Sequence, residues 1–120
     1  IGCGSVNTIN GTLEESPNQD TIVIANDSLE YDITIIETGF YSWLATQPPR
    51  GFFSQQILEN RNRFSVAEYN RRTQDPRYNR TDLYIMPINY EPDVDYGYEV
   101  NYLLYNYFEF FEQRYSQRLR

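Results

Sequence analysis

The sequence YGYEVNYLLYNYFEFFEQRY at residues 96–115 is the longest periodic stretch of the chain, and we expect the fold to form around it. At about 100° per residue, its apolar side chains recur with the spacing of one helix face. One stripe collects Val100, Leu104, Tyr107, Phe108, Phe111 and Tyr115, with Leu103 and Phe110 at its flanks. Such a stripe is typical of a helix that buries one face against a core. The stretch therefore predicts a long C-terminal helix.

The opposite side of the same helix is also aromatic. Tyr98, Tyr102 and Tyr105 line up there, together with Glu109. Tyrosine buries a large ring but keeps a hydroxyl that needs water or a partner, and it is enriched at protein interfaces. Core packing alone would account for many of the twelve tyrosines. Two aromatic faces nevertheless exceed what a small domain needs, so we expect these four residues to bind a partner protein.

The composition excludes several classes of function. The 120-residue chain has ten basic and seventeen acidic residues, a net charge of −7, no histidine and one cysteine. Nucleic acid and anionic membranes require clustered positive charge, so neither is an expected partner. Without His or Lys, the chain cannot form a histidine-based triad, a Schiff base or a His-ligated zinc site. We expect a protein without a cofactor that is not an enzyme, since catalysis would have to use Asp, Glu, Tyr or Arg alone.

The charges are sorted along the chain, and all ten basic residues are arginines. Residues 49–80 contain seven arginines and three acidic residues, whereas 1–48 and 81–113 each contain seven acidic residues and no base. Arginine pairs bidentately with carboxylates and stacks on tyrosine rings. We therefore expect the basic middle segment to dock on its acidic neighbours within the fold.

The remainder of the chain predicts short strands and short helices. Residues 21–25 are β-prone, and 29–37 alternate apolar and polar side chains as a half-buried strand does. Residues 83–90 are a further strand candidate, placed at an edge by Pro87 and paired antiparallel with 29–37. The cluster at 40–45 predicts a helical turn, while a cap at Ser54 and a capping box at Ser65 predict helices over 54–60 and 66–74.

These elements define the expected fold class as α+β. We expect a small antiparallel sheet of two or three strands, packed by short helices and by the long C-terminal helix. Residues 21–120 form a single domain in this reading. Residues 1–20 are polar and aperiodic, which favours a flexible tether that also carries a lipid-anchor region.

An acidic run precedes the long helix. Asp93, Asp95 and Glu99 alternate around Gly97, and such oxygen ligands suit a hard cation such as calcium. The spacing does not match an EF-hand loop, which makes them weak metal candidates. Acidic side chains at a helix N-terminus also cap its unpaired N–H groups and face the positive end of its dipole. Capping is the preferred interpretation, and no metal site is expected.

A second aromatic group lies in the first half of the chain. Tyr41, Trp43, Phe52 and Phe53 surround Arg50 in the sequence and form a candidate stacking platform for a glycan. This platform supports an alternative function as a glycan-binding or peptidoglycan-binding module.

Ile1-Gly2-Cys3 looks like the end of a bacterial lipobox, in which a cysteine after a small residue becomes lipidated. Cys3 is the single cysteine, so it cannot form an internal disulfide, and lipidation accounts for it. A polar tether directly after an acylated cysteine lets a domain stand away from a membrane.

Several motifs carry a resemblance to a known family: GFYSWLATQ (39–47), NRF (62–64), YNRR (69–72), INY (88–90) and DYGYEVNYLLYNY (95–107). Over about residues 31–119 the chain resembles a family of small Bacteroidota lipoproteins that contain a domain of unknown function. The resemblance implies lipidation at Cys3 and residence at the outer membrane. No acidic run follows Cys3, which favours the periplasmic face over the cell surface. The tripeptides at 20–22 and 27–29 also resemble an O-glycosylation motif of exported Bacteroidota proteins, which makes Thr21 and Ser28 candidate acceptors.

The sequence therefore predicts a non-enzymatic lipoprotein, anchored to the outer membrane through its lipid alone. Its expected role is that of an accessory or structural subunit of an outer-membrane protein complex, for protein assembly, secretion or nutrient uptake. The tyrosine-rich helix face is the expected contact surface. Glycan or peptidoglycan binding through the aromatic platform is the alternative.

Overall fold

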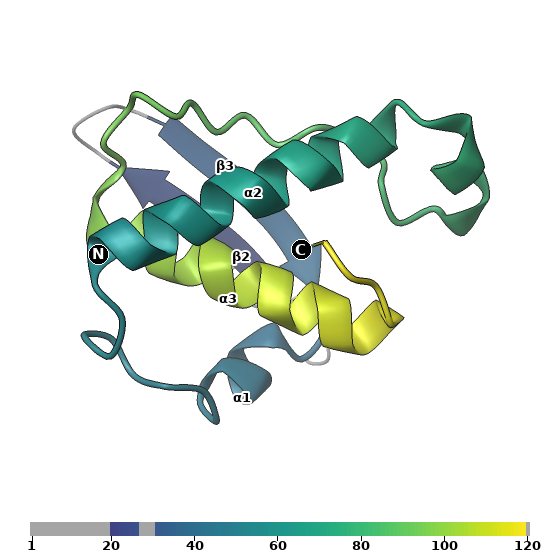
Figure 1. Cartoon of the computed structure of the whole chain (residues 1–120). Helices are drawn as coiled ribbons and strands as arrows, with labels where there is room; N and C mark the ends of the chain where they lie inside the picture. The colour runs from purple at the N-terminus through teal and green to yellow at the C-terminus, as the bar shows by residue number, and fades with distance from the viewer. Residues whose placement is uncertain (1–19, 27–30, 120) are drawn as a thin grey trace, which may run out of the picture.

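The computed structural model describes residues 20–26 and 31–119 of the chain (Figure 1). It combines helix and strand and ends in a long helix, as expected. Strand, helix and 3₁₀ elements follow one another as β2 (Asp20–Asn26), β3 (Tyr31–Glu37), α1 (Phe40–Leu44), α2 (Gln55–Thr73), η1 (Pro76–Thr81) and α3 (Gly97–Tyr115). The element bounds agree with the sequence for β2, α1 and α3, each within one or two residues.

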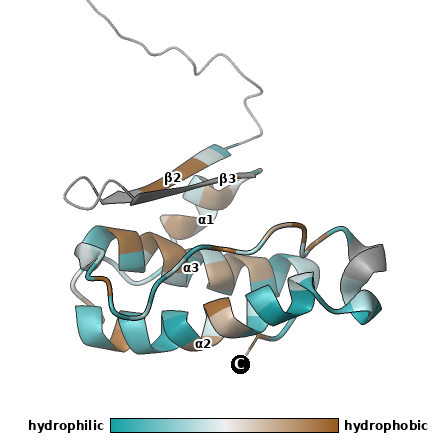
Figure 2. Cartoon of the chain, turned by 90° about the horizontal axis from the view of Figure 1, so that it is seen from above, coloured by the Kyte–Doolittle hydropathy of each residue, from teal (hydrophilic) through white to brown (hydrophobic). Residues whose placement is uncertain are grey.

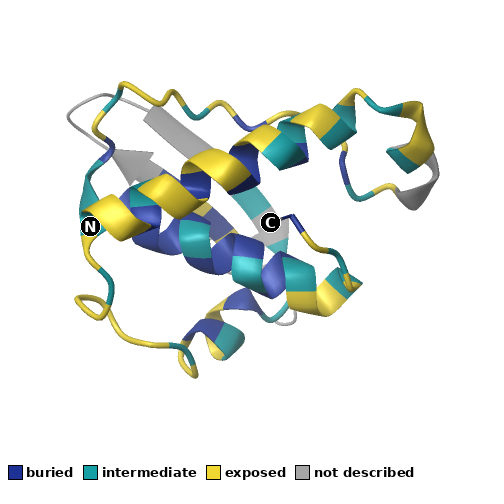
Figure 3. Ribbon diagram, in the orientation of Figure 1, coloured by how far each residue is buried: buried dark blue, intermediate teal, exposed yellow. Residues whose placement is uncertain are grey.

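Helix α3 is the middle layer of the molecule. Figure 2 shows the strand pair on one side of it and α2 on the other. Its side chains are consequently buried almost all round, including both flanks of the predicted apolar stripe (Figure 3). An element that is covered on two sides needs two apolar faces. This position explains the aromatic residues on both sides of α3.

Helices α2 and α3 run parallel. Asn62 of α2 donates a hydrogen bond to Asn101 of α3. Seven residues further along each helix, Tyr69 of α2 packs on Phe108 of α3, so the two helices point in the same direction. A parallel pair needs a long crossover connection, which η1 and the segment after it provide (Figure 1).

The two strands pair with each other. β2 and β3 are antiparallel, with Ile22 opposite Ile35 and Ile24 opposite Ile33. Ile22 and Ile24 are fully buried, and the β2 strand contacts α3. These two isoleucines lie on the same face of β2 and pack the strand pair against the central helix.

The prediction of a strand at 83–90 was wrong. This segment is irregular, and the backbone groups of one of its residues, Ile88, bond to a side chain instead of a neighbouring strand. Asn70 of α2 accepts a hydrogen bond from the Ile88 amide (2.7 Å) and donates one to the Ile88 carbonyl (2.8 Å). An amide side chain that bonds to both backbone groups of one residue replaces one rung of a β ladder.

The prediction of two helices over 54–60 and 66–74 was also wrong, because α2 is continuous through both. Its start is as expected: the Ser54 hydroxyl accepts from the Ile57 amide, 3.2 Å away. Ser65 instead lies buried in the middle of the helix, and the Glu68 carboxylate accepts from Arg71 and Arg72. The capping box therefore does not form.

Several predictions fall outside the described residues. Cys3, Ser28 and the tether up to residue 19 belong to segments for which no structure is described. Asp20, which we expected to end the tether, belongs to β2, and its carboxylate accepts from the Tyr41 amide at 2.8 Å. Of the helices that are described, none combines the length and the apolar character that crossing a membrane requires.

Candidate functional site

The predicted partner-binding face of α3 is covered by the chain itself. Residues 45–54 connect α1 to α2 and cross this face; we call them the strap. The Tyr98 hydroxyl accepts from the Gly51 amide (2.7 Å) and donates to the Phe53 carbonyl (2.8 Å). The Tyr102 hydroxyl donates to the Pro48 carbonyl at 3.0 Å, and this residue is only 4% exposed.

Tyr105 is also partly buried, with the Phe53 ring packed edge-on against its own at 5.5 Å. We expected Tyr98, Tyr102 and Tyr105 to form a face that binds a partner protein, but all three are buried wholly or in part under the strap. Tyr98 and Tyr102 bind the strap through their hydroxyls, and Tyr105 packs on it through its ring. A backbone group of the same chain satisfies a buried phenol as well as a partner protein would. The fourth predicted contact residue, Glu109, lies beyond the strap and lines a different pocket.

Arg50 fixes the centre of the strap. Its guanidinium donates two hydrogen bonds to the Glu99 carboxylate, at 2.7 and 2.6 Å. The guanidinium carbon also lies 4.6 Å from the centroid of the Tyr102 ring. This pair joins the basic middle segment to an acidic neighbour, as expected. Arg71 and Arg77 instead pair within their own segment, with Glu68 and Asp75.

Arg50 also lines a surface groove between α1 and the strap. The groove has a volume of about 380 Å³, which is within the range of small-molecule sites. Its lining combines apolar side chains with two phenols, an amide and a guanidinium: Tyr41, Leu44, Ala45, Gln47, Pro49, Arg50 and Tyr102. This groove is the candidate functional site.

Tyr41 presents the accessible aromatic surface of the groove. Its side chain is 43% exposed, and the Asp20 carboxylate of β2 holds its backbone amide. Partial burial, together with the charges of Asp20 and Glu99, raises the pKa of the Tyr41 phenol. The hydroxyl is therefore neutral at physiological pH and able both to donate and to accept hydrogen bonds.

The structure divides the predicted aromatic platform. Tyr41 and Arg50 line the groove, but Trp43 lies on the other side of α1, where its ring packs edge-on against Phe110 at 5.4 Å. Phe53 turns inward from the strap and packs against the core, while Phe52 is 65% exposed. Two of the five predicted platform residues thus share one site.

The weak metal candidates do not converge. Asp95 accepts from the Gly97 amide at 3.0 Å and from Gln55 at 2.8 Å, and Glu99 is held by Arg50. Within the described part of the chain, no three His, Cys, Asp or Glu residues are grouped as metal ligands. Asp95 thus binds the first N–H group of α3, whereas the N-cap residue Tyr96 makes no side-chain cap hydrogen bond, so the capping interpretation stays a prediction. Asp93 is exposed.

Sequence reasoning missed several groove residues. Leu44, Ala45, Gln47 and Pro49 lie between the aromatic residues that the platform hypothesis selected. The sequence feature that could have indicated these residues is the Pro48-Pro49-Arg50-Gly51 turn, in which Gly51 adopts a φ of 93°. A turn with this positive φ folds the chain back over α3 and places Arg50 beside Tyr102.

Of the two candidate glycosylation residues, Thr21 is exposed on β2 and Ser28 is outside the described residues. Glycosylation of either stays a prediction.

Comparison with known proteins identifies the family of the chain. A model described as a family of unknown function, DUF6146, matches residues 3–120, and the chain therefore belongs to this family. This match confirms the expected membership of an uncharacterised family. The Bacteroidota lipoprotein assignment stays a prediction. No curated protein and no solved structure shows a significant match.

Proposed function

We propose that this member of the DUF6146 family is a lipid-anchored, non-enzymatic binding protein that holds a saccharide in the groove between α1 and the strap. The observation that carries the proposal is the joint presence of Tyr41 and Arg50 in one groove of about 380 Å³. Cys3 supplies the lipid anchor at the outer membrane, and the periplasmic face is the proposed location.

The chemistry of the groove suits a sugar ring. A sugar has a C–H face that packs on an aromatic or apolar wall, and hydroxyl groups that pair with planar polar side chains. Tyr41, Leu44 and Pro49 provide such a wall, while Gln47 and Arg50 provide the polar groups. Arg50 is already oriented by Glu99 and by the Tyr102 ring, so a ligand does not need to order it.

The charges favour a neutral saccharide over an anionic one. Glu99 neutralises the guanidinium of Arg50 through two short hydrogen bonds. The chain as a whole has a net charge of −7, which repels anionic ligands. Neutral N-acetylglucosamine oligomers are therefore the preferred class of probe.

Isothermal titration calorimetry with chitotetraose tests the proposal. We expect saturable binding, and we expect Tyr41→Ala and Arg50→Ala each to weaken it by about tenfold or more. Phe64→Ala is the matched control, because this aromatic residue is 72% exposed on α2 and does not line the groove. No saturable heat, or equal weakening by the control, would contradict a saccharide site here.

Arg50→Ala also separates binding from stability. Both side chains of the Arg50–Glu99 pair are more than half exposed, so the pair stabilises the fold by about 1 kcal/mol or less. The variant should unfold at nearly the same urea concentration as the wild type while losing affinity.

A second candidate function is the accessory subunit of an outer-membrane complex, through a surface other than the tyrosine face. Exposed apolar side chains that share the outward side of α2 favour it, since apolar groups gathered on one surface mark sites of protein contact. Ile57 and Phe64 lie two turns apart on that side and are 43% and 72% exposed.

Purification of the tagged protein from its native membrane in mild detergent tests this candidate. A specific partner should co-purify with the wild type and be lost from Ile57→Ser/Phe64→Ser, with the fold intact by circular dichroism. Tyr41→Ala is the control that should keep the partner. Retention of the partner by the double variant would contradict docking on α2.

A further inference from the structure

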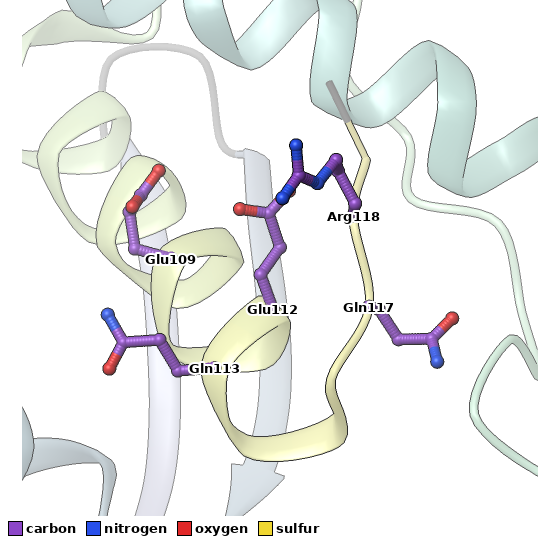
Figure 4. Close-up of a pocket in the computed structure, with 5 residues that line it drawn as sticks. All are labelled: Glu109, Glu112, Gln113, Gln117 and Arg118. Atoms are coloured by element: carbon purple, nitrogen blue, oxygen red, sulfur yellow. The ribbon is translucent and has the colours of Figure 1, made fainter.

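A second pocket lies at the far end of α3, away from the groove. It has a volume of about 320 Å³ and is formed by Glu109, Glu112 and Gln113 of the helix with Gln117 and Arg118 of the tail that follows it (Figure 4). This pocket is independent of the groove and of the saccharide proposal.

The pocket is held in shape by backbone contacts. The chain reverses at Ser116, which has a φ of 54°, and the Gln117 amide donates to the Glu112 carbonyl at 3.0 Å. The Leu119 amide then donates to the Glu112 carboxylate at 2.6 Å, while the Leu119 side chain is buried. The tail is therefore fixed beside the helix, and the pocket is formed before any ligand arrives.

Two of the lining amides are already oriented by neighbours. The Gln113 carbonyl oxygen accepts from the Trp43 indole N–H at 3.2 Å, which leaves the Gln113 NH₂ group as a donor. The Gln117 carbonyl oxygen accepts from the Tyr84 hydroxyl at 2.7 Å, and its NH₂ group donates to the Tyr115 carbonyl. Gln117 thus stabilises the tail, and Gln113 is available to a ligand.

The charges of the pocket are divided between its two walls. Glu109 and Glu112 project from the helix at its C-terminal end, where the helix dipole also favours cations. Arg118 projects from the tail, and among the described residues its guanidinium makes no ion pair. A ligand with a single charge would meet a like charge on one wall.

We propose that this pocket binds a small zwitterion, such as an α-amino acid. Its ammonium group lies against the carboxylates of Glu109 and Glu112, which accept its hydrogen bonds alongside those they already make. Its carboxylate lies against Arg118, whose planar guanidinium matches it bidentately. A volume near the lower limit of ligand sites suits one amino acid better than a longer chain.

L-Alanine is the probe for this site, and two analogues separate its charges. N-acetyl-L-alanine lacks the ammonium group, and L-alaninamide lacks the carboxylate. We expect L-alanine to give saturable heat in calorimetry and a saturable change in the emission of Trp43, which contacts Gln113. Each analogue should bind about tenfold more weakly or worse, because it loses one of two charge-assisted contacts.

Variants locate the binding on the protein. Glu109→Gln and Arg118→Gln should each weaken L-alanine by about tenfold or more. Arg77→Gln is the matched control, because Arg77 is an exposed arginine on η1 that pairs with Asp75 and does not line the pocket. It should leave the affinity unchanged.

Three results would overturn the proposal. One is the absence of saturable binding of L-alanine to the wild-type protein. The second is equal affinity for L-alaninamide, which would indicate a site for simple cations. The third is unchanged affinity in both pocket variants after circular dichroism shows that they are folded.

Discussion

The Tyr98 hydroxyl illustrates how the aromatic face of α3 binds the strap. Its oxygen accepts from one strap amide and donates to one strap carbonyl, so both functions of the hydroxyl are used within the chain. The backbone N–H and C=O groups of a loop that crosses a helix need hydrogen-bond partners. One phenol hydroxyl can accept from an N–H group and donate to a C=O group. The same atom is therefore not available to a partner protein.

Removing this hydroxyl tests its structural role. We expect Tyr98→Phe to lower the free energy of unfolding by about 1–3 kcal/mol, because the substitution leaves the Gly51 amide and the Phe53 carbonyl without their partner. Urea unfolding followed by circular dichroism measures the change. Tyr41→Phe is the control, since the Tyr41 hydroxyl makes no hydrogen bond within the described residues. Equal stability of Tyr98→Phe and the wild type would show that the strap does not depend on this contact.

The two faces of α3 differ in how well helical periodicity predicts their surroundings. The spacing of Val100, Leu104 and Phe108 predicted a buried face, and all three are buried. The spacing of Tyr98 and Tyr102 placed them correctly on the opposite face but could not show what covers it. Periodicity reports which side chains share a face. The cover comes from a segment about fifty residues away, whose path depends on a turn at Gly51.

Among the secondary-structure elements, α2 shows how tertiary burial overrides a local start signal. Ser65 and Glu68 have the spacing of a capping box, yet Ser65 is 1% exposed and lies within the helix. Asn62 and Val66, which lie on the same side of the helix as Ser65, are also buried, so the helix keeps one continuous face against α3. A break at Ser65 would have left that face without its middle turn.

Two serine substitutions distinguish one long helix from two short ones. Ser54→Ala should lower the free energy of unfolding by about 1 kcal/mol, because it removes the N-cap bond to the Ile57 amide. Ser65→Ala should be neutral or stabilising, because Ala has the higher helix propensity and no cap is lost. Thermal unfolding of both variants measures the difference. A larger loss from Ser65→Ala would indicate that a helix begins there.

The irregular segment at 83–90 also depends on α2. Its apolar residues favoured a strand, but Ile85 and Met86 are more than 70% exposed, and Asn70 satisfies the Ile88 backbone. Nothing in the local sequence of 83–90 indicates Asn70 as a partner, because the two are separated by η1. Strand formation depends on an available neighbour more than on local propensity.

The stability of the whole molecule depends on carboxylates that arginines hold at the C-terminal end of α2 and directly after it. The hydrogen bonds of Arg71 and Arg72 lower the pKa of the Glu68 carboxyl to about 2, and Arg77 and Arg71 lower the pKa of Asp75. A depressed pKa in the folded state means that the ionised form stabilises the fold. That contribution is complete above the ordinary glutamate pKa and is lost as pH falls towards the folded value.

The expected result is a decline in stability between pH 4.5 and about 2 that Glu68→Gln makes less steep. The effect is moderate because the Glu68 side chain is partly exposed to solvent. Urea midpoints across this pH interval, for the wild type and the variant, measure it. A parallel decline in both proteins would assign the acid sensitivity to other carboxyls.

The buried tyrosines of the core make the folded molecule less stable at alkaline pH. Burial raises the pKa of Tyr69 to about 12, and burial together with the nearby Glu37 carboxylate raises the pKa of Tyr107 further still. A raised phenol pKa means that the unfolded chain loses its protons first, so the stabilisation is complete below pH 10 and is lost as pH rises through about 12. We expect phenolate absorbance to rise together with the loss of helical circular dichroism in this interval. Tyr107→Phe should shift that transition to higher pH. The variant lacks a phenol whose ionisation at alkaline pH favours the unfolded state. An unchanged midpoint would show that Tyr107 does not control the alkaline transition.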